Sequence, residues 1–187
     1  MFAECTDALY LCLTTLTIAA SLSRAWDAMT QKVRSLKVFG CGFPMPVHRI
    51  WTIRITRPQR RQLYRIRHRA TPLEGVALLF GIYEDANTAV RVVRIDEMEN
   101  VAQSKATFAI DPEEQFRIIS EAENQGLVQV GIYHSHPAPP KPSGWDLEYM
   151  AYNPVVWIID GVSIIARRMK AYQLIEGKLH SVRIQTV

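Results

Sequence analysis

Two histidines, His134 and His136, stand on either side of Ser135, directly after the apolar run Val128–Tyr133. The apolar run predicts a strand, and successive side chains on a strand point to opposite faces. The two imidazoles would therefore point the same way at the end of the strand. So placed, they can bind one divalent ion, and zinc is the ion that histidine and carboxylate ligands favour in tetrahedral geometry.

A carboxylate for the same ion follows at Asp146. Ser143 is a suitable N-cap for a helix that would place Asp146 at its third position, where the helix dipole and the free N–H groups favour an anion. Pro137 and three further prolines would hold the intervening loop rigid by fixing φ. Three protein ligands leave a fourth position open to water, which is the arrangement of a catalytic zinc site.

A catalytic site of this kind needs a base that takes a proton from the water and returns it to the leaving group. Glu74 is the candidate, because it stands just before the apolar strand Val76–Phe80, where an acid without a partner is costly to bury. The alternative is that Glu74 caps, or pairs with, the arginine-rich helix that precedes it.

The elements that would carry these residues follow from the periodicity of the apolar side chains. Strands are expected at residues 49–55, 76–83, 89–95, 127–136, 155–159, 163–166, 169–175 and 179–184, and helices are expected to begin at Thr56, Asp111 and Ser143. On the first strand, Trp51, Ile53 and Ile55 would share one face. The order of elements predicts one α/β domain, with a mixed β-sheet flanked by helices.

The composition is that of a globular protein with a core of its own. Apolar residues make up 48% of the 187 residues and charged residues 21%, which excludes a collagen, a disordered tail and a multi-span membrane protein. The three cysteines, Cys5, Cys12 and Cys41, are an odd number confined to the first quarter of the chain. No disulfide framework is therefore expected in the main body. A reducing, cytoplasmic setting is expected instead.

The positive charge is concentrated in one segment. Residues 24–69 hold 12 of the 22 Lys and Arg but a single acid, Asp27. Such a segment can attract nucleic acid, an anionic membrane or an acidic partner, or it can simply be a solvated helix face. There is no firm signal for nucleic acid or for a membrane, because few aromatics are interleaved with the charges and the apolar run 8–23 is short for a membrane span.

The first 44 residues differ in pattern from the rest of the chain. Gly and Pro are concentrated in residues 39–46, which favours a boundary there. We therefore expect residues 1–44 to be a weakly ordered extension or an amphipathic helix, since Trp26, Met29, Val33 and Leu36 have helical spacing. The main domain would span residues 45–187.

Together, Glu74, His134-Ser135-His136-Pro137 and Ser143-x-x-Asp146 resemble the signature of the JAMM (MPN-plus, Mov34) zinc metallopeptidases. The segments LEGVALLFG at residues 73–81 and GLVQVGIY at residues 126–133 are also similar to strands of that family. The resemblance covers residues 49–187 and implies the family's cytidine-deaminase-like mixed sheet. The long insertions of the eukaryotic relatives are missing, so a minimal prokaryotic form is expected.

The resemblance assigns one zinc ion per chain to His134, His136 and Asp146. It makes Glu74 the general base and acid, and Ser143 a group that helps to stabilise the oxyanion. It implies hydrolysis of an amide bond by metal-activated water, on conjugates of a ubiquitin-like or sulfur-carrier protein. One departure concerns Ser143, because six residues separate it from His136 where the family usually has seven.

Three other functions stay open on the sequence alone. The same site could act on small peptides unrelated to ubiquitin-like proteins, because a site determines the reaction and not the substrate. The domain could be a non-catalytic MPN scaffold, although a scaffold would be expected to lack one or more ligands. It could also be a nucleic-acid-associated binding module that uses the basic segment. The sequence leaves the oligomeric state open.

We expect a protein that begins at Met45 to fold and to bind zinc, because residues 1–44 should contribute little to the core. In thermal unfolding, its melting temperature should lie within a few degrees of that of the full chain. Aggregation, or a large loss of thermal stability, would instead show that the helical pattern from Trp26 to Leu36 covers an apolar surface of the domain.

Overall fold

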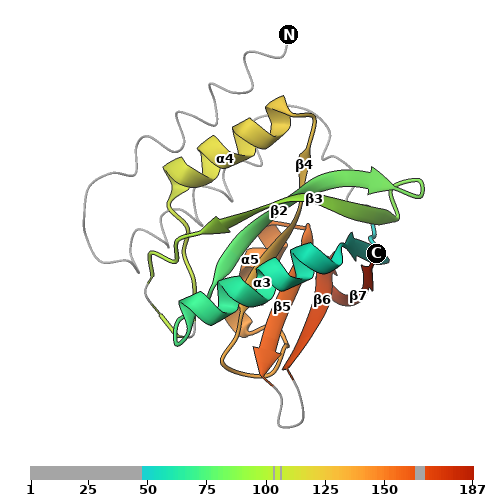
Figure 1. Ribbon diagram of the computed structural model, residues 1–187. Coiled ribbons are helices and arrows are strands. Elements are labelled where there is room, and N and C mark those ends of the chain that lie inside the picture. Colours follow the sequence, from blue (N-terminus) through green and yellow to red (C-terminus); the bar gives the residue numbers. More distant parts are fainter. Residues whose placement is uncertain (1–47, 103, 106, 163–166) are drawn as a thin grey trace, which may run out of the picture. The chain divides into compact units, whose positions relative to one another are not determined.

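The computed structural model describes residues 48–187, except 103, 106 and 163–166 (Figure 1). The extension expected at residues 1–44 and the strand expected at 163–166 lie outside these residues. Within them the chain forms three helices, which are α3 (Arg57–Ala70), α4 (Pro112–Asn124) and α5 (Gly144–Tyr152). None of the described helices has the length and apolar character needed to cross a membrane.

The described strands join into one mixed sheet that closes on itself in the order β1-β3-β2-β4-β5-β6-β7. Their bounds are β1 (Thr52–Ile55), β2 (Val76–Glu84), β3 (Ala89–Met98), β4 (Val128–Ser135), β5 (Val156–Val162), β6 (Arg167–Ile175) and β7 (Lys178–Thr186). β1 pairs in parallel with both β3 and β7, and β4 pairs in parallel with β5. The other neighbours are antiparallel. The expected mixed α/β fold is therefore confirmed.

Capping residues set the starts of the helices, as the sequence predicts. The Thr56 hydroxyl accepts a hydrogen bond from the Gln59 N–H, and the Gln59 side chain accepts one from the Thr56 N–H, which is a capping box with Pro58 in the first turn of α3. The Asp111 carboxylate accepts hydrogen bonds from the first free N–H groups of α4. Both helices thus begin within one residue of the expected position.

Helices cover the sheet on two sides, so two apolar clusters form. Leu63 and Ile66 of α3 pack with one set of strand residues, and Ala122 of α4 and Met150 of α5 belong to the other. In Figure 1, α3 passes in front of the strands and α5 lies behind them. The first half of β2 is buried on both faces, which explains its continuous apolar run. The candidate functional residues lie next to the start of β2.

The first strand begins later than expected, at Thr52 instead of Arg49. Ile53 and Ile55 are completely buried, but Trp51 is 51% exposed. The reason is that β1 begins at Thr52, so Trp51 precedes the regular pleat, although its backbone still bonds to Thr88 and Arg183. The guanidinium of Arg49 lies 3.6 Å from the centre of the indole ring, and this cation–π contact stabilises the exposed position.

Candidate metal centre

The two histidines lie close together at the end of β4. His134 is completely buried and pairs with Val76 of β2 on one side and with Ile159 of β5 on the other. His136 follows the last residue of β4, and its backbone N–H donates to the Asp160 carbonyl. The Nε2 atoms of the two histidines lie 2.9 Å apart. The alternation of strand side chains therefore places both imidazoles on the same side, as predicted.

The first turn of α5 supplies the carboxylate. Ser143 is the N-cap, its hydroxyl accepts a hydrogen bond from the Asp146 N–H, and its own N–H donates to Asp146 Oδ2 at 2.6 Å. This reciprocal capping box holds the carboxylate over the start of the helix. The Asp146 oxygens lie 3.3 Å from Nε2 of His134 and 3.3 Å from Nε2 of His136. The loop of six residues thus brings Asp146 to the histidines.

The three side chains fit a metal ion. One potential ligand atom of each lies within 4.8 Å of the others. Two Nε2 atoms that face each other across 2.9 Å in a buried site cannot both be protonated without repulsion, whereas a cation between them and the carboxylate would satisfy all three. Two imidazoles and one carboxylate are a donor set that suits zinc. We call His134, His136 and Asp146 the metal triad.

The electrostatics of the metal triad favour the ligand forms of two of its members. Burial lowers the pKa of His134, so the imidazole is neutral and free to coordinate. Burial raises the pKa of Asp146, but the hydrogen bonds with His134 and His136 outweigh it and hold that pKa well below its usual range. For His136, burial lowers the pKa, but Asp146 and Glu74 bring it above the ordinary value.

Glu74 lies beside the metal triad, just before the first residue of β2. Its side chain is almost completely buried, and Oε1 lies 3.7 Å from Nε2 of His136. Burial raises the pKa of Glu74 to about 7, with His136 lowering it and Asp146 raising it. In the part of the chain that the structure describes, the ionic neighbour of Glu74 is thus His136 and not an arginine of α3. A carboxyl group with a pKa near 7 can both accept and release a proton.

Aromatic side chains that the sequence analysis did not single out form one wall of the site. The centre of the Phe108 ring lies 5.1 Å from that of His134, and Trp157 makes a T-shaped contact with the same imidazole, with ring centres 5.8 Å apart. Tyr149 stacks against Phe108. Phe108 comes from the irregular connection between β3 and α4, where no periodicity points to burial. A large apolar residue in a polar connection was the only available signal.

A buried ion pair lies behind the site. Arg67 of α3 places Nη1 2.8 Å from Oδ1 of Asp160, which is completely buried in β5. The Tyr133 hydroxyl lies 3.2 Å from the other oxygen of Asp160. Because the Asp160 carbonyl also accepts the His136 N–H, this network connects α3 and β5 to the end of β4. An acid inside an apolar strand is a sequence signal for a buried partner, but it does not identify Arg67 as that partner.

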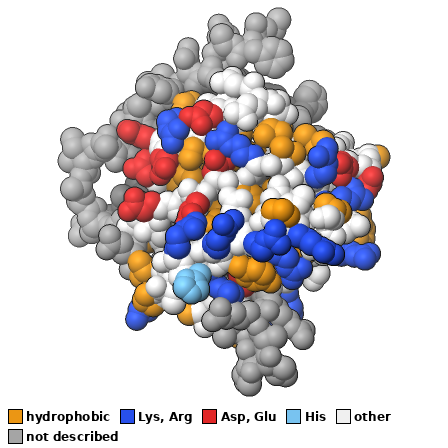
Figure 2. Space-filling view, in the orientation of Figure 1, with side chains coloured by type: hydrophobic (Ala, Val, Ile, Leu, Met, Phe, Trp, Pro, Cys, Tyr) orange, Lys and Arg blue, Asp and Glu red, His pale blue; other side chains and the backbone are white. Residues whose placement is uncertain are grey.

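Much of the basic segment is a solvated helix face in the described residues. Figure 2 shows Lys and Arg side chains gathered over the region where α3 lies. Arg57, Arg61, Arg65 and Arg69 are exposed on that helix. Two arginines of the segment also form ion pairs at the surface, Arg54 with Glu84 and Asp85, and Arg69 with Glu97. The solvated-face interpretation is therefore sufficient for α3.

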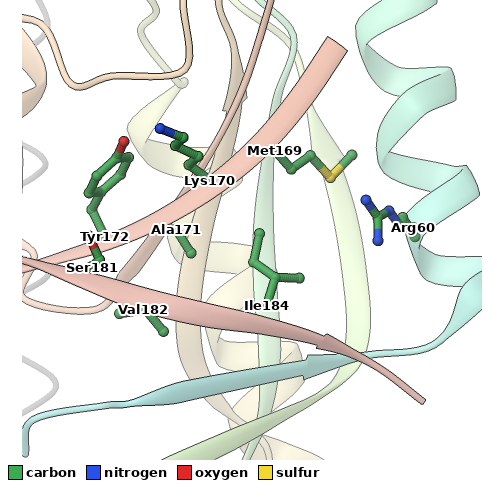
Figure 3. A pocket seen from close by; sticks show the side chains of 8 residues that line it. All are labelled: Arg60, Met169, Lys170, Ala171, Tyr172, Ser181, Val182 and Ile184. Atoms are coloured by element: carbon green, nitrogen blue, oxygen red, sulfur yellow. The ribbon is translucent and has the colours of Figure 1, made fainter. Parts of the chain in front are cut away.

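A hollow of about 410 Å³ lies apart from the metal triad, between α3, β6 and β7 (Figure 3). β6 and β7 pair from Ala171 and Val182 to their connecting turn. Beyond Ala171 and Val182, away from the turn, the described parts of the two strands do not pair. The hollow is lined where they separate, by Arg60, Met169, Lys170, Ala171, Tyr172, Ser181, Val182 and Ile184. Neither Glu74, Ser143 nor any member of the metal triad lines it, so it is not part of the candidate centre.

Comparisons with known proteins agree with the geometry. A desampylase of Pyrococcus furiosus is 47% identical over 70 residues, which cover 37% of this chain and 50% of that protein. A desampylase of Haloferax volcanii is 33% identical over 81 residues, which cover 42% of this chain and 58% of that protein. The chain therefore spans only about half the length of these curated relatives.

Solved structures share the fold. The solution structure of a protein from Desulfitobacterium hafniense has a TM-score of 0.63 and 27% identity, and the match covers 72% of this chain and 92% of that one. A protein from Salinibacter ruber has a TM-score of 0.51 and 28% identity, with 74% and 92% covered. Residues 56–175 match the family model Prok-JAB, described as prokaryotic homologs of the JAB domain. Since this match takes in more than half of the chain, the protein belongs to the prokaryotic JAB (JAMM/MPN) family.

Proposed function

We propose that the protein is a zinc-dependent isopeptidase that hydrolyses the amide bond in conjugates of a ubiquitin-like or sulfur-carrier protein. The observation that carries the proposal is the juxtaposition of a complete metal triad with a buried carboxyl group, whose Oε1 lies 3.7 Å from His136. A non-catalytic scaffold has no need of the full ligand set. The two relatives named desampylase support a substrate of the ubiquitin-like SAMP class.

In this proposal the residues of the site divide the work of binding the ion and moving the proton. His134, His136 and Asp146 hold the ion, and Ser143 fixes the Asp146 carboxylate through the capping box. Zinc, when bound, supplies a Lewis acid that polarises the carbonyl and acidifies water. Glu74 takes the proton from the attacking water and delivers it to the leaving nitrogen, for which a pKa of about 7 is well matched.

Ser143 has a further task in the proposal. Its hydroxyl oxygen accepts the Asp146 N–H, and a hydroxyl group that accepts one hydrogen bond still has its own proton to donate. The side chain is half-buried at the mouth of the site, so this proton can stabilise the oxyanion that develops on the substrate carbonyl. Capping and catalysis are therefore compatible roles for the same hydroxyl group.

The metal prediction is tested by elemental analysis of the purified protein. We expect about one zinc ion per chain, and His134→Ala or Asp146→Ala should lose it while circular dichroism shows a folded domain. His180→Ala is the matched control, because His180 lies on β7 outside the metal triad and should leave the zinc content unchanged. Full occupancy in both triad variants would contradict the assignment.

The substrate class is tested with two kinds of amide. The zinc-loaded protein should release a ubiquitin-like protein, encoded in the same genome, from a lysine side chain, with the products identified by mass spectrometry. A chelator should stop the reaction and added zinc should restore it. Cleavage of unrelated small peptides at the same rate would favour the small-peptide alternative. No cleavage of either substrate by zinc-loaded protein would refute the proposed activity.

A further inference from the structure

The connection between β3 and α4 contains a side chain whose hydrogen-bonding capacity is fully used. Asn100 Nδ2 donates to the carbonyl of Glu74 at 3.0 Å and to that of Thr107 at 3.3 Å. Its Oδ1 accepts the N–H groups of Ala102 and Ala109, each at 3.2 Å. A primary amide offers two N–H donors and two acceptor lone pairs, so all four are engaged. The bonds to residues 102, 107 and 109 set the path of the connection.

The fourth hydrogen bond of the Asn100 side chain is made to the backbone of Glu74, the candidate base. Glu74 precedes β2, and its carbonyl accepts the Asn100 amide, while its N–H lies 3.4 Å from the carbonyl of Ser104 in the same connection. On the other side, Gly75 exchanges two hydrogen bonds with Ser135, which stands between the histidines. Glu74 is therefore held between β4 and the connection, and among the described residues the Asn100 side chain joins its backbone to the connection.

The same connection also contacts the metal triad. Phe108, which lies against the His134 ring, is flanked by two residues whose backbones bond to Asn100, namely Thr107 and Ala109. Phe108 is 9% exposed, so it is packed in place. Asn100 thus couples the backbone of the candidate base to the aromatic wall of the site.

We propose that Asn100 is a positioning residue, which holds the Glu74 backbone so that the carboxyl group is aligned for proton transfer. This inference rests on the proposed function, in which Glu74 moves the proton. Misplacement of a reacting group by about 1 Å can cost about 10²-fold in rate. A side chain that fixes the backbone of the base without touching the reacting atoms therefore has a large effect on turnover and a small one on binding.

Asn100→Asp separates the two halves of the hydrogen-bond pattern. The variant keeps an oxygen for the Ala102 and Ala109 N–H groups, but it places a second oxygen against the carbonyls of Glu74 and Thr107. In zinc-loaded full-length protein we expect kcat on the conjugate to fall at least about tenfold while KM changes less than about threefold. Zinc content should stay at about one per chain.

Amide hydrogen exchange measured by NMR provides the second readout. In Asn100→Asp the Glu74 backbone should move away from the connection, so the Glu74 N–H, which lies 3.4 Å from the Ser104 carbonyl, should exchange at least about tenfold faster, while the Ala102 and Ala109 amides keep their protection. In Asn100→Ala all three should exchange faster, and KM should rise as the connection loosens. Asn124→Asp is the matched control, because Asn124 is exposed at the last position of α4, and both readouts should stay at wild-type values.

The outcomes of these two measurements decide whether Asn100 is a positioning residue. Unchanged kcat in folded, zinc-loaded Asn100→Asp would overturn the positioning role, and so would unchanged exchange of the Glu74 amide. Loss of zinc from both Asn100 variants would also overturn it, because Asn100 would then support the fold as a whole. If the wild-type protein cleaves no conjugate, the proposed function fails by itself, and the exchange measurement alone decides whether Asn100 holds Glu74.

Discussion

Glu74→Gln should retain about one zinc ion per chain and lose turnover by about 10²–10⁴-fold, the range expected when a general acid–base group is removed. The amide has nearly the same shape as the carboxyl group, so the packing around residue 74 is kept. It cannot take up a proton at neutral pH, so the attacking water loses its acceptor and the leaving nitrogen its donor. The measurement is kcat on the conjugate, together with zinc analysis of the same sample.

The result is specific only if another glutamate can be changed without effect. Glu123→Gln is the matched control, because it makes the same chemical change at a residue that is exposed near the end of α4, away from the site. It should leave turnover within twofold or so of wild type. Unchanged hydrolysis in Glu74→Gln would remove Glu74 from the mechanism. Loss of zinc would show instead that Glu74 is needed to bind the ion.

Asp160→Ala should lower the free energy of unfolding by about 3–5 kcal/mol, the cost of leaving one member of a buried ion pair without its partner. Arg67 is buried, with its side chain 10% exposed, so water cannot replace the lost carboxylate. The Tyr133 hydroxyl loses a partner as well. Denaturant unfolding followed by circular dichroism measures the change, provided that the zinc occupancy of the two proteins is equal.

A double variant distinguishes a charge effect from a packing effect. Asp160→Leu combined with Arg67→Met removes both charges, and it should recover much of the loss, because well-packed apolar residues often replace a buried ion pair at little cost. Glu121→Ala is the surface control. It pairs with the exposed Arg117 and with Arg94, which keeps Asp96 as a partner, so the change should stay below about 1 kcal/mol. An Asp160→Ala protein as stable as wild type would show that water reaches Arg67.

The parts of the site that depend on local periodicity could be predicted from the sequence. The alternation along β4 places His134 and His136 together, and the capping pattern at Ser143 places Asp146 in the first turn of α5. These features depend on residues within a few positions of one another, where backbone geometry is nearly determined. The burial of Glu74 also followed, because it adjoins a strand that is apolar on both faces.

Features that depend on distant segments could not be predicted in this way. Arg67 and Asp160 are 93 positions apart, and nothing in the pattern of either segment indicates the other. Phe108 and Asn100 lie in an irregular connection, whose path is set by individual hydrogen bonds and not by a period. Trp51 has the right spacing for the buried face of β1, but the strand begins one residue later. Periodicity identifies a face and leaves open what covers it.

The parallel pairing of β1 with β7 has a consequence for the order of folding. Thr52 is in register with Arg183, so the ring of strands cannot close until β7 has been synthesised. Contacts between residues so far apart form slowly, because the loop entropy is lost before the contacts form. The metal triad and Glu74, in contrast, lie within residues 74–146, next to the antiparallel pair of β2 and β4. In a nascent chain, β2, β4 and β5 can therefore bring the metal triad and Glu74 together before β7, the last of the described strands, is available to β1.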